Sequence, residues 1–236
     1  MSSRATHRLA SDPRVRRGLN AQLYDRRRRL ARGERSLGWK LGFGSPDAMA
    51  RLGIDAPLVG YLLEGGALAS GAGISISGWA NPVLEPEVAI HVGRDLVASD
   101  DREAAREAIA AIGPAFELVD LDGPADDVEA ILQVNVFQRH VVLGPASARF
   151  EATRLVGRIV GPGSEERVVD DAQRTTGDVV ALLRHVADLV GAFGETVRAG
   201  EVVICGSIVP PIAAAPGAEI SYRLDPLGEI SIRLEH

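Results

Sequence analysis

Two glutamates lie two positions apart in an otherwise apolar stretch of the sequence. They are Glu85 and Glu87 in the segment LEPEVAI, residues 84–90. If this segment is a strand, residues i and i+2 share one face, so both carboxylates point the same way. Like charges placed side by side repel one another and lose hydration. A divalent cation would remove that conflict, and carboxylate oxygens favour hard ions such as Mg²⁺ or Mn²⁺.

The same pair has a plainer interpretation, which the pattern alone leaves open. An edge strand can expose both carboxylates to water, and Pro86 between them is typical of such an edge. A metal site would also need a third ligand. Glu117 qualifies because apolar residues flank it in AFELV, residues 115–119. Asp120 and Asp122 compete for the same role.

Lys40 is the only lysine in the sequence, and the other 25 of the 26 basic residues are arginines. A GC-rich genome would replace lysine by arginine wherever either residue serves. Such a bias leaves open why lysine is retained at this one position. A lysine with a lowered pKa can donate or accept a proton, whereas arginine stays protonated.

Composition limits the classes of protein to consider. The chain has 236 residues, of which 46% are hydrophobic and 25% charged. These values are typical of a soluble globular domain that buries a core. No apolar run reaches the ~18 residues of a membrane helix, and the N-terminus lacks the apolar core of a secretory signal. The lone cysteine, Cys205, excludes a disulfide scaffold. We expect a cytoplasmic protein.

The charge balance argues against nucleic-acid binding. The net charge is −6, and aromatic residues make up only 4% of the chain. The basic run Arg26–Arg29 is the one feature that favours such binding. We interpret it instead as the solvated face of a helix or as a contact between subunits.

The elements that must position these residues indicate a strand-rich α+β chain. Residues 1–70 form a helical and glycine-rich N-terminal region that contributes Lys40, and residues 71–236 form the catalytic part with the metal site. We expect helices over residues 13–32, 47–52, 101–112 and from Asp178 to near Gly194, with most of 34–70 irregular. We expect strands over residues 83–92, 115–121, 131–144, 152–170, 201–209, 218–224 and 229–235.

Four motifs, in order along the chain, carry a resemblance to a known family. They are GWKLGFGSPDAMARLGIDAPLVGYLL, VLEPEVAIHVGRDL, IGPAFELVD and AGEVVICGSIVPP. They resemble the 2-keto-4-pentenoate hydratase group of the fumarylacetoacetate hydrolase superfamily. Its relatives include 4-oxalocrotonate decarboxylase and 2-oxohept-3-enedioate hydratase. The resemblance covers about residues 15–235, which is nearly the whole chain.

The resemblance implies a fold, a cofactor and a set of site residues. The implied fold is α+β, a mixed β-barrel-like roll with a short helical N-terminal region, and the implied assembly is a homo-oligomer. Glu85, Glu87 and Glu117 match the family's Mg²⁺ ligands. Lys40 matches the lysine beside the substrate, and Ser207 matches a residue near the substrate carboxylate.

Two departures from the family pattern leave the reaction open. Where hydratases of this group often carry an acid, this chain has PLVG at residues 57–60, with Leu58 in place of the acid. Decarboxylase-like relatives also lack that acid. The stretch QVNVFQ at residues 133–138 keeps only one residue of the family pattern, Asn135, which we assign to substrate binding.

The leading hypothesis is a Mg²⁺-dependent hydratase that adds water to a 2-hydroxydienoate or 2-oxo-enoate and gives a 4-hydroxy-2-oxo acid. Hydration and loss of CO₂ both pass through an enolate that a cation stabilises. A decarboxylase of a vinylogous 2-oxo acid is therefore the alternative. A third hypothesis is a catalytically silent subunit that binds a keto acid or supports a pathway partner. The expected partner is a small-molecule acid, with no nucleic acid and no membrane.

Overall fold

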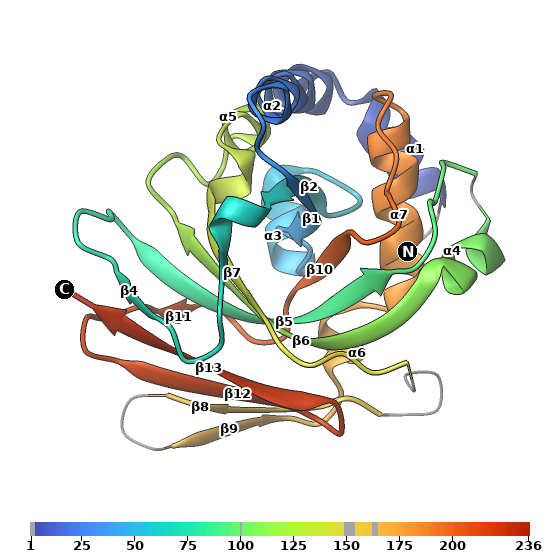
Figure 1. Ribbon diagram of the computed structural model, residues 1–236. Helices are drawn as coiled ribbons and strands as arrows, with labels where there is room; N and C mark the ends of the chain where they lie inside the picture. The colour runs from blue at the N-terminus through green and yellow to red at the C-terminus, as the bar shows by residue number, and fades with distance from the viewer. Residues whose placement is uncertain (1–2, 100, 149–153, 162–164) are drawn as a thin grey trace.

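A computed structural model describes residues 3–99, 101–148, 154–161 and 165–236. The centre of the part that it describes is an eight-stranded sheet. In spatial order, seven of its strands are β2 (Leu58–Leu63), β1 (Ser36–Gly42), β10 (Val202–Ser207), β5 (Pro82–Val92), β6 (Ile109–Asp120), β7 (Gln138–Leu143) and β3 (Ala67–Leu68). The eighth, β11 (Ile212–Ala213), pairs with β5. The sheet curls, so that β2 approaches β7 (Figure 1).

A second sheet of five strands lies beneath the first (Figure 1). Its order is β4 (Gly73–Ser75), β13 (Gly228–Glu235), β12 (Glu219–Asp225), β8 (Val156–Val160) and β9 (Glu166–Val169). The two sheets meet where Phe116 and Tyr222 pack with ring centroids 5.7 Å apart. Strands β8 and β9 fall within the segment predicted as strand over 152–170. Residues 152–153 and 162–164 of that prediction lie outside the described residues.

Helices lie mainly around the curled sheet, on the side away from the second sheet (Figure 1). They are α1 (Ser3–Ser11), α2 (Pro13–Ala31), α3 (Pro46–Leu52), α4 (Arg102–Ala108), α5 (Val128–Gln133), α6 (Ala172–Thr176) and α7 (Val179–Gly191), with the short 3₁₀ turns η1 (Glu64–Gly66) and η2 (Asn135–Phe137). Asp12 caps α2 by accepting a hydrogen bond from Arg14 N, and Asp178 caps α7 by accepting one from Ala181 N. None of the helices formed by the described residues is long and apolar enough to span a membrane.

One predicted helix ends early. The helix expected over residues 101–112 stops at Ala108, and the chain continues directly into β6. Within that strand Ile112 pairs with Ile90 of β5. Sheet pairing here overrides the helix propensity of an alanine-rich segment.

Two other segments also differ from expectation. The strand predicted over residues 131–144 is present only as β7, because the first part of the segment completes α5 and then forms η2. The stretch 34–70, expected to be mostly irregular, contains β1, α3 and β2. Strands from residues 1–70 and from residues 71–236 pair in one sheet, and the division of the chain at residue 70 stays a prediction.

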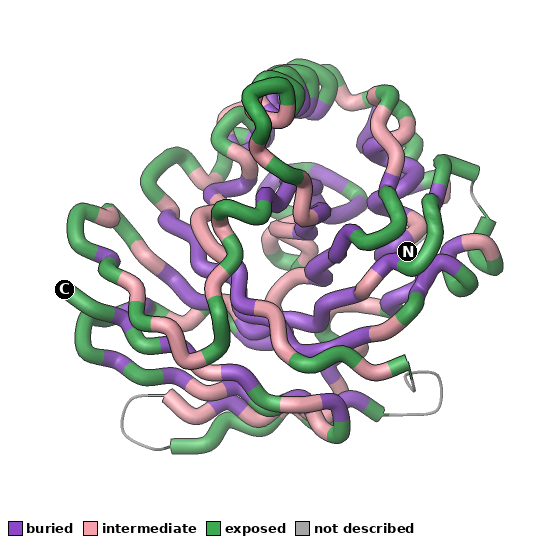
Figure 2. The backbone as a smooth tube through the Cα atoms, viewed as in Figure 1, coloured by how far each residue is buried: buried purple, intermediate pink, exposed green. Residues whose placement is uncertain are grey.

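The two faces of the curled sheet are packed differently. Side chains such as Trp39 and Phe116 point outward into the main core, which is shared with the helices and the second sheet. The inner face carries a smaller apolar cluster that includes Ala89, Ala115 and Ile204. Buried backbone runs along β5, β6 and β10 (Figure 2). Polar groups on the inner face are therefore surrounded by apolar side chains, which shield them from water.

Candidate active site

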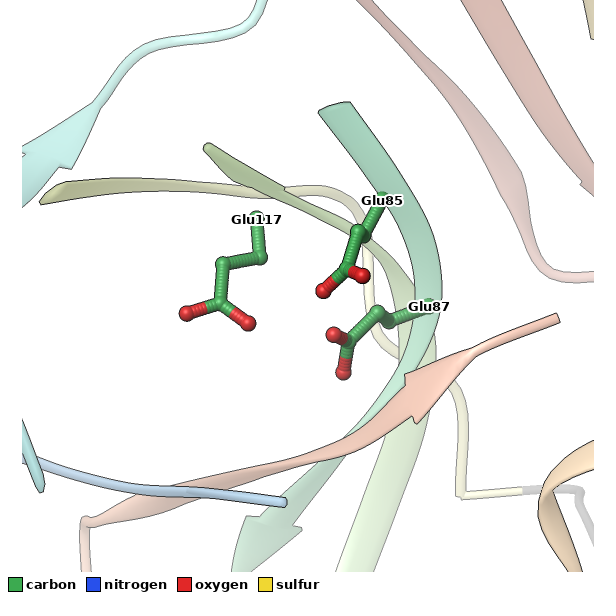
Figure 3. A group of neighbouring side chains, drawn as sticks. All are labelled: Glu85, Glu87 and Glu117. Carbon is green, nitrogen blue, oxygen red and sulfur yellow. The ribbon is translucent and has the colours of Figure 1, made fainter. Parts of the chain in front are cut away.

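Three glutamates meet on the inner face of the curled sheet. Glu85 and Glu87 come from β5, and Glu117 comes from β6, where it lies directly opposite Glu85 in the antiparallel register. One carboxylate oxygen from each residue lies within 4.8 Å of the other two. The three carboxylates point toward one another (Figure 3). Because β5 pairs with β10 on one side and β6 on the other, it is not an edge strand, and the edge interpretation of the pair is wrong.

The carboxylates receive little help from hydrogen-bond donors. Glu87 and Glu117 are both 0% exposed. The backbone N–H of Gly206 donates to Glu87 Oε2 at 2.6 Å, from a bulged part of β10 where Gly206 has a φ of 88°. Glu87 Oε1 and Glu117 Oε2 have no hydrogen-bond partner among the described residues. Buried carboxylate oxygens in this state are costly unless a proton or a cation binds them.

Burial raises the pKa of all three carboxyls. The pKa of Glu87 lies well above its ordinary value because the side chain is buried, and the charges of Glu117 and Glu85 raise it further. Burial raises the pKa of Glu117 to about 7, against the opposing effect of Lys40. Burial also raises the pKa of Glu85, and Lys40 again opposes the shift. Three negative charges beside one lysine are thus unfavourable, and either a bound proton or a bound cation would relieve them.

The amine of Lys40 lies beside the carboxylates. Its Nζ is 2.6 Å from Glu117 Oε1 and donates a hydrogen bond of 3.2 Å to the carbonyl oxygen of Val136. The residue is 1% exposed. Strands β10 and β5 separate β1 from β6 in the sheet, so the curl of the sheet is what brings Lys40 to Glu117.

Two glycines leave room for the Lys40 side chain. A Cβ at Gly60, which pairs with Lys40 across β1 and β2, would lie 3.0 Å from Lys40 Cγ and 3.0 Å from Asn135 Oδ1. A Cβ at Gly42 would lie 2.8 Å from Val136 Cγ1 and 3.7 Å from Lys40 Nζ. The lysine therefore lies in a slot that any larger residue at these two positions would crowd.

A short left-handed turn supplies the carbonyl that Lys40 binds. Asn135, Val136 and Phe137 have φ values of 54°, 53° and 61°. This region is strained for a β-branched residue such as Val136, at a cost of about 1–3 kcal/mol. The sequence does not signal this turn, because no glycine marks these positions.

Asn135 fastens this turn to β2. Its Oδ1 accepts a hydrogen bond of 2.8 Å from Tyr61 N, and its Nδ2 donates one of 2.9 Å to Tyr61 O. Both ends of the side-chain amide are therefore bonded to one residue of β2. The predicted role of Asn135 in substrate binding stays a prediction.

The other residues singled out in the sequence lie close by in different settings. Ser207 pairs with Glu87 across β10 and β5, and its Oγ makes a long hydrogen bond of 3.5 Å to Pro86 O. Asp120 accepts hydrogen bonds from the backbone N–H groups of Ala80 and Asn81. Asp122 forms an ion pair of 2.7 Å with Arg139. The two aspartates are thus engaged elsewhere, and the carboxylate group contains Glu117.

The donor set of this site suits a hard divalent cation. All three side chains offer oxygen, which Mg²⁺, Mn²⁺ and Ca²⁺ prefer over the nitrogen and sulfur ligands typical of zinc. Oxygens within 4.8 Å of one another can share one ion at the usual metal–oxygen distances of about 2.0–2.6 Å. A cation there would satisfy the unpartnered oxygens and offset the excess negative charge. Such a site can bind an anionic substrate and stabilise negative charge that develops on it.

Comparison with known proteins gives consistent matches across the chain. Residues 44–235 match the family described as fumarylacetoacetate (FAA) hydrolase C-terminal. A 4-oxalocrotonate decarboxylase of Pseudomonas putida is 26% identical over 215 residues, which cover 88% of this chain and 81% of that protein. A 2-hydroxyhexa-2,4-dienoate hydratase of Comamonas testosteroni is 30% identical over 223 residues, with the same two shares covered.

A solved structure extends the comparison to three dimensions. The 4-oxalocrotonate decarboxylase from Pseudomonas putida G7, complexed with magnesium and adipate, superposes with a TM-score of 0.82 at 24% identity. The match covers 90% of this chain and 83% of that one. The predicted α+β fold, a mixed and curled β roll, is confirmed by this likeness and by the two sheets described above.

Proposed function

Because the chain belongs to the fumarylacetoacetate hydrolase C-terminal family, we propose that it is a divalent-metal-dependent lyase acting on a 2-hydroxydienoic or 2-oxo acid. The observation that carries the proposal is the meeting of three carboxylates, two of them fully buried, with a buried lysine on one face of the sheet. Relatives named as hydratases and decarboxylases support the same class of reaction. Hydration to a 4-hydroxy-2-oxo acid is our first candidate.

In this proposal Glu85, Glu87 and Glu117 hold the cation, which is Mg²⁺ or Mn²⁺. Their all-oxygen donor set and the unpartnered oxygens of Glu87 and Glu117 support that assignment. A bound divalent cation supplies positive charge that favours the enolate form of a 2-oxo acid. The apolar cluster of the inner face, with Ala89 and Ala115, keeps water from screening that charge.

Lys40 performs the proton transfer in this proposal. Nζ is held between Glu117 Oε1 and the Val136 carbonyl. In this role Lys40 gives a proton to the terminal carbon of the dienolate and regains the proton that the 2-hydroxyl group loses, which leaves a conjugated 2-oxo acid. Water then adds its oxygen to the distal carbon of the conjugated acid and its proton to the adjoining carbon. Ser207, at the end of β10, would donate from Oγ to the substrate carboxylate. Asn135 would contribute to substrate binding by holding the turn next to β2.

Decarboxylation is the second candidate, and one observation favours it. Leu58, at the position where hydratases of the resembling group often carry an acid, is an apolar residue with 0% exposure at the start of β2. An apolar residue there removes a group that could guide water. The same enolate-stabilising site would then serve loss of CO₂, as the names of several relatives suggest. The silent-subunit hypothesis remains a third outcome, in which an acid binds and is not converted.

Product analysis with a panel of acids tests the proposal. The protein, freed of metal and then supplied with Mg²⁺ or Mn²⁺, is incubated with 2-hydroxypenta-2,4-dienoate, 2-hydroxyhexa-2,4-dienoate and 4-oxalocrotonate. A 4-hydroxy-2-oxo acid without CO₂ supports a hydratase, and released CO₂ supports a decarboxylase. Glu87→Gln should abolish turnover, whereas Glu219→Gln, at an exposed position of β12, should leave it unchanged. Binding of these acids without conversion of any of them would contradict the proposed enzyme and favour the silent subunit.

We also propose that the chain forms a homo-oligomer, with the arginine-rich helix α2 at a subunit contact. Arg27 and Arg28 of that helix are both exposed in the single chain. Arg27 pairs with Glu195, and Arg28 pairs with Asp25. Exposed ion pairs add little to the stability of a single chain. These arginines could therefore form contacts with another subunit at little cost to the stability of the chain.

A further inference from the structure

The turn formed by Asn135, Val136 and Phe137 is left-handed at three consecutive residues and directs the Val136 carbonyl toward Lys40. All three residues have φ values between 53° and 61°, and none is glycine. Left-handed backbone is uncommon for non-glycine residues and is a genuine outlier for valine. Strained backbone of this kind persists only where the surroundings impose it, and it clusters at functional sites.

The surroundings hold this turn from both sides. The Asn135 amide makes two hydrogen bonds with the Tyr61 backbone, and Phe137 N donates to Val134 O at 3.2 Å. The Val136 and Phe137 side chains are 2% and 1% exposed. The backbone of the turn is therefore fixed to β2 on one side and packed into the core on the other.

The fixed turn directs the Val136 carbonyl toward the Lys40 amine. The 3.2 Å hydrogen bond from Nζ to this carbonyl and the 2.6 Å contact with Glu117 define the position of the amine from two directions. A glycine stands at each point where a side chain would push the turn or the lysine away. Gly42 faces Val136 Cγ1, and Gly60 faces Asn135 Oδ1.

We propose that the Asn135–Phe137 turn is a positioning device for the Lys40 amine, with Asn135 and Val136 as positioning residues that do not touch the reacting atoms. The inference rests on the proposed function in so far as Lys40 transfers a proton there. A lysine amine stands on a flexible four-carbon stem, so it needs contacts that select one position. Without the carbonyl, Glu117 alone would hold the amine and would draw it toward the carboxylates.

The kinetic test compares a valine-to-glycine substitution at two nearby positions, Val136 in the turn and Val134 before it. Val136→Gly removes the buried side chain that packs the turn beside Gly42. Glycine accepts a φ of 53° without strain, so the variant tests the packing that fixes the carbonyl. Val134→Gly makes the identical change at an exposed residue with a φ of −95°. A misplacement of about 1 Å costs up to about 100-fold in rate. We therefore expect kcat of Val136→Gly to fall by about 10- to 100-fold, with KM and the Kd for Mg²⁺ nearly unchanged.

A second variant covers the case in which Val136→Gly does not fold. Asn135→Ala removes both hydrogen bonds to Tyr61 and keeps the rest of the turn, and Asn20→Ala on the exposed side of α2 is its control. The same selective loss of kcat is expected for Asn135→Ala. Folded variants of Asn135 or Val136 that keep the kcat of the unmodified protein would overturn the proposal.

The sole lysine allows a test that needs no turnover. Lysine labelled with ¹³C at Cε gives one NMR signal in this chain, because Lys40 is the only lysine. We expect an ordered Cε in the unmodified protein and in Val134→Gly, and a more mobile Cε, shifted toward free lysine, in Val136→Gly and Asn135→Ala. An unchanged signal in both turn variants would overturn the positioning role. If the proposed reaction fails while the signal still changes, the proposed function is wrong and the positioning of Lys40 stands.

Discussion

Glu87→Gln should make the metal-free protein more stable and at the same time remove its stabilisation by divalent cations. The residue is 0% exposed, and its carboxylate lies within 4.8 Å of those of Glu85 and Glu117. Two unit charges no more than 4.8 Å apart repel by at least about 3.5 kcal/mol at an effective dielectric constant of about 20. Glutamine removes this repulsion and can still accept the hydrogen bond from Gly206 N.

The net gain should be smaller than the full repulsion. Burial and the neighbouring charges already raise the pKa of Glu87, so part of the repulsion is relieved by protonation in the unmodified protein. We expect the free energy of unfolding to rise by about 1–2 kcal/mol, which corresponds to a Tm increase of about 2–8 °C for a chain of this size. The assay is differential scanning calorimetry in the presence of a chelator.

The response to cations supplies the second half of this prediction. A ligand present at about 100 times its Kd stabilises the folded protein by about 2.7 kcal/mol, or a Tm rise of about 5–11 °C. The unmodified protein should show such a rise with Mg²⁺ or Mn²⁺, as should the control Glu219→Gln. Glu87→Gln should show little or none. The reasoning is refuted if Glu87→Gln lowers the metal-free Tm, or if Mg²⁺ and Mn²⁺ raise the Tm of Glu87→Gln as much as that of the unmodified protein.

Two further predictions concern buried cationic or neutral groups. Lys40→Arg should keep the positive charge and the fold but lower kcat by about 10²–10⁴-fold. The reasons are that arginine does not transfer protons and that a guanidinium crowds the slot beside Gly60. Steady-state kinetics measure this loss, and near-native rates would contradict it. His185 should make the protein less stable in acid, since burial lowers its pKa from 6.5 to about 4 while it bonds Thr6 Oγ1 and Pro57 O. Its contribution is complete above pH 6.5 and is lost as the pH falls toward 4, by about 3 kcal/mol in all. Urea unfolding at several pH values measures this, and a pH dependence that is unchanged in His185→Gln would rule it out.

The carboxylate geometry could be predicted from the sequence because it depends on local rules. The alternation of a strand places Glu85 and Glu87 on one face. The pattern leaves Asp120 and Asp122 as competitors of Glu117, and the family resemblance is what favours Glu117. The structure adds the register, in which Glu117 lies opposite Glu85. The alternative interpretation, in which Pro86 marks an edge, is wrong because β5 lies between two partner strands.

The long-range features could not be predicted in this way. Lys40 meets Glu117 only because the sheet curls across two intervening strands, and no local pattern encodes that curl. The helix over 101–112 was overestimated because alanine-rich sequence favours helix, whereas pairing with β5 decides the state of Ile112. The left-handed turn at Val136 was missed because its residues favour other conformations and are held in place by Tyr61 and the core.

The measurement that tests the central claim most directly is metal-dependent turnover of a 2-hydroxydienoate. The protein is freed of divalent cations with a chelator, assayed, and assayed again after Mg²⁺ is restored, beside Glu87→Gln and Glu219→Gln. We predict no conversion without the cation, conversion after its return in the unmodified protein and in Glu219→Gln, and none in Glu87→Gln. Equal conversion with and without the cation, or full conversion by Glu87→Gln, would contradict the account.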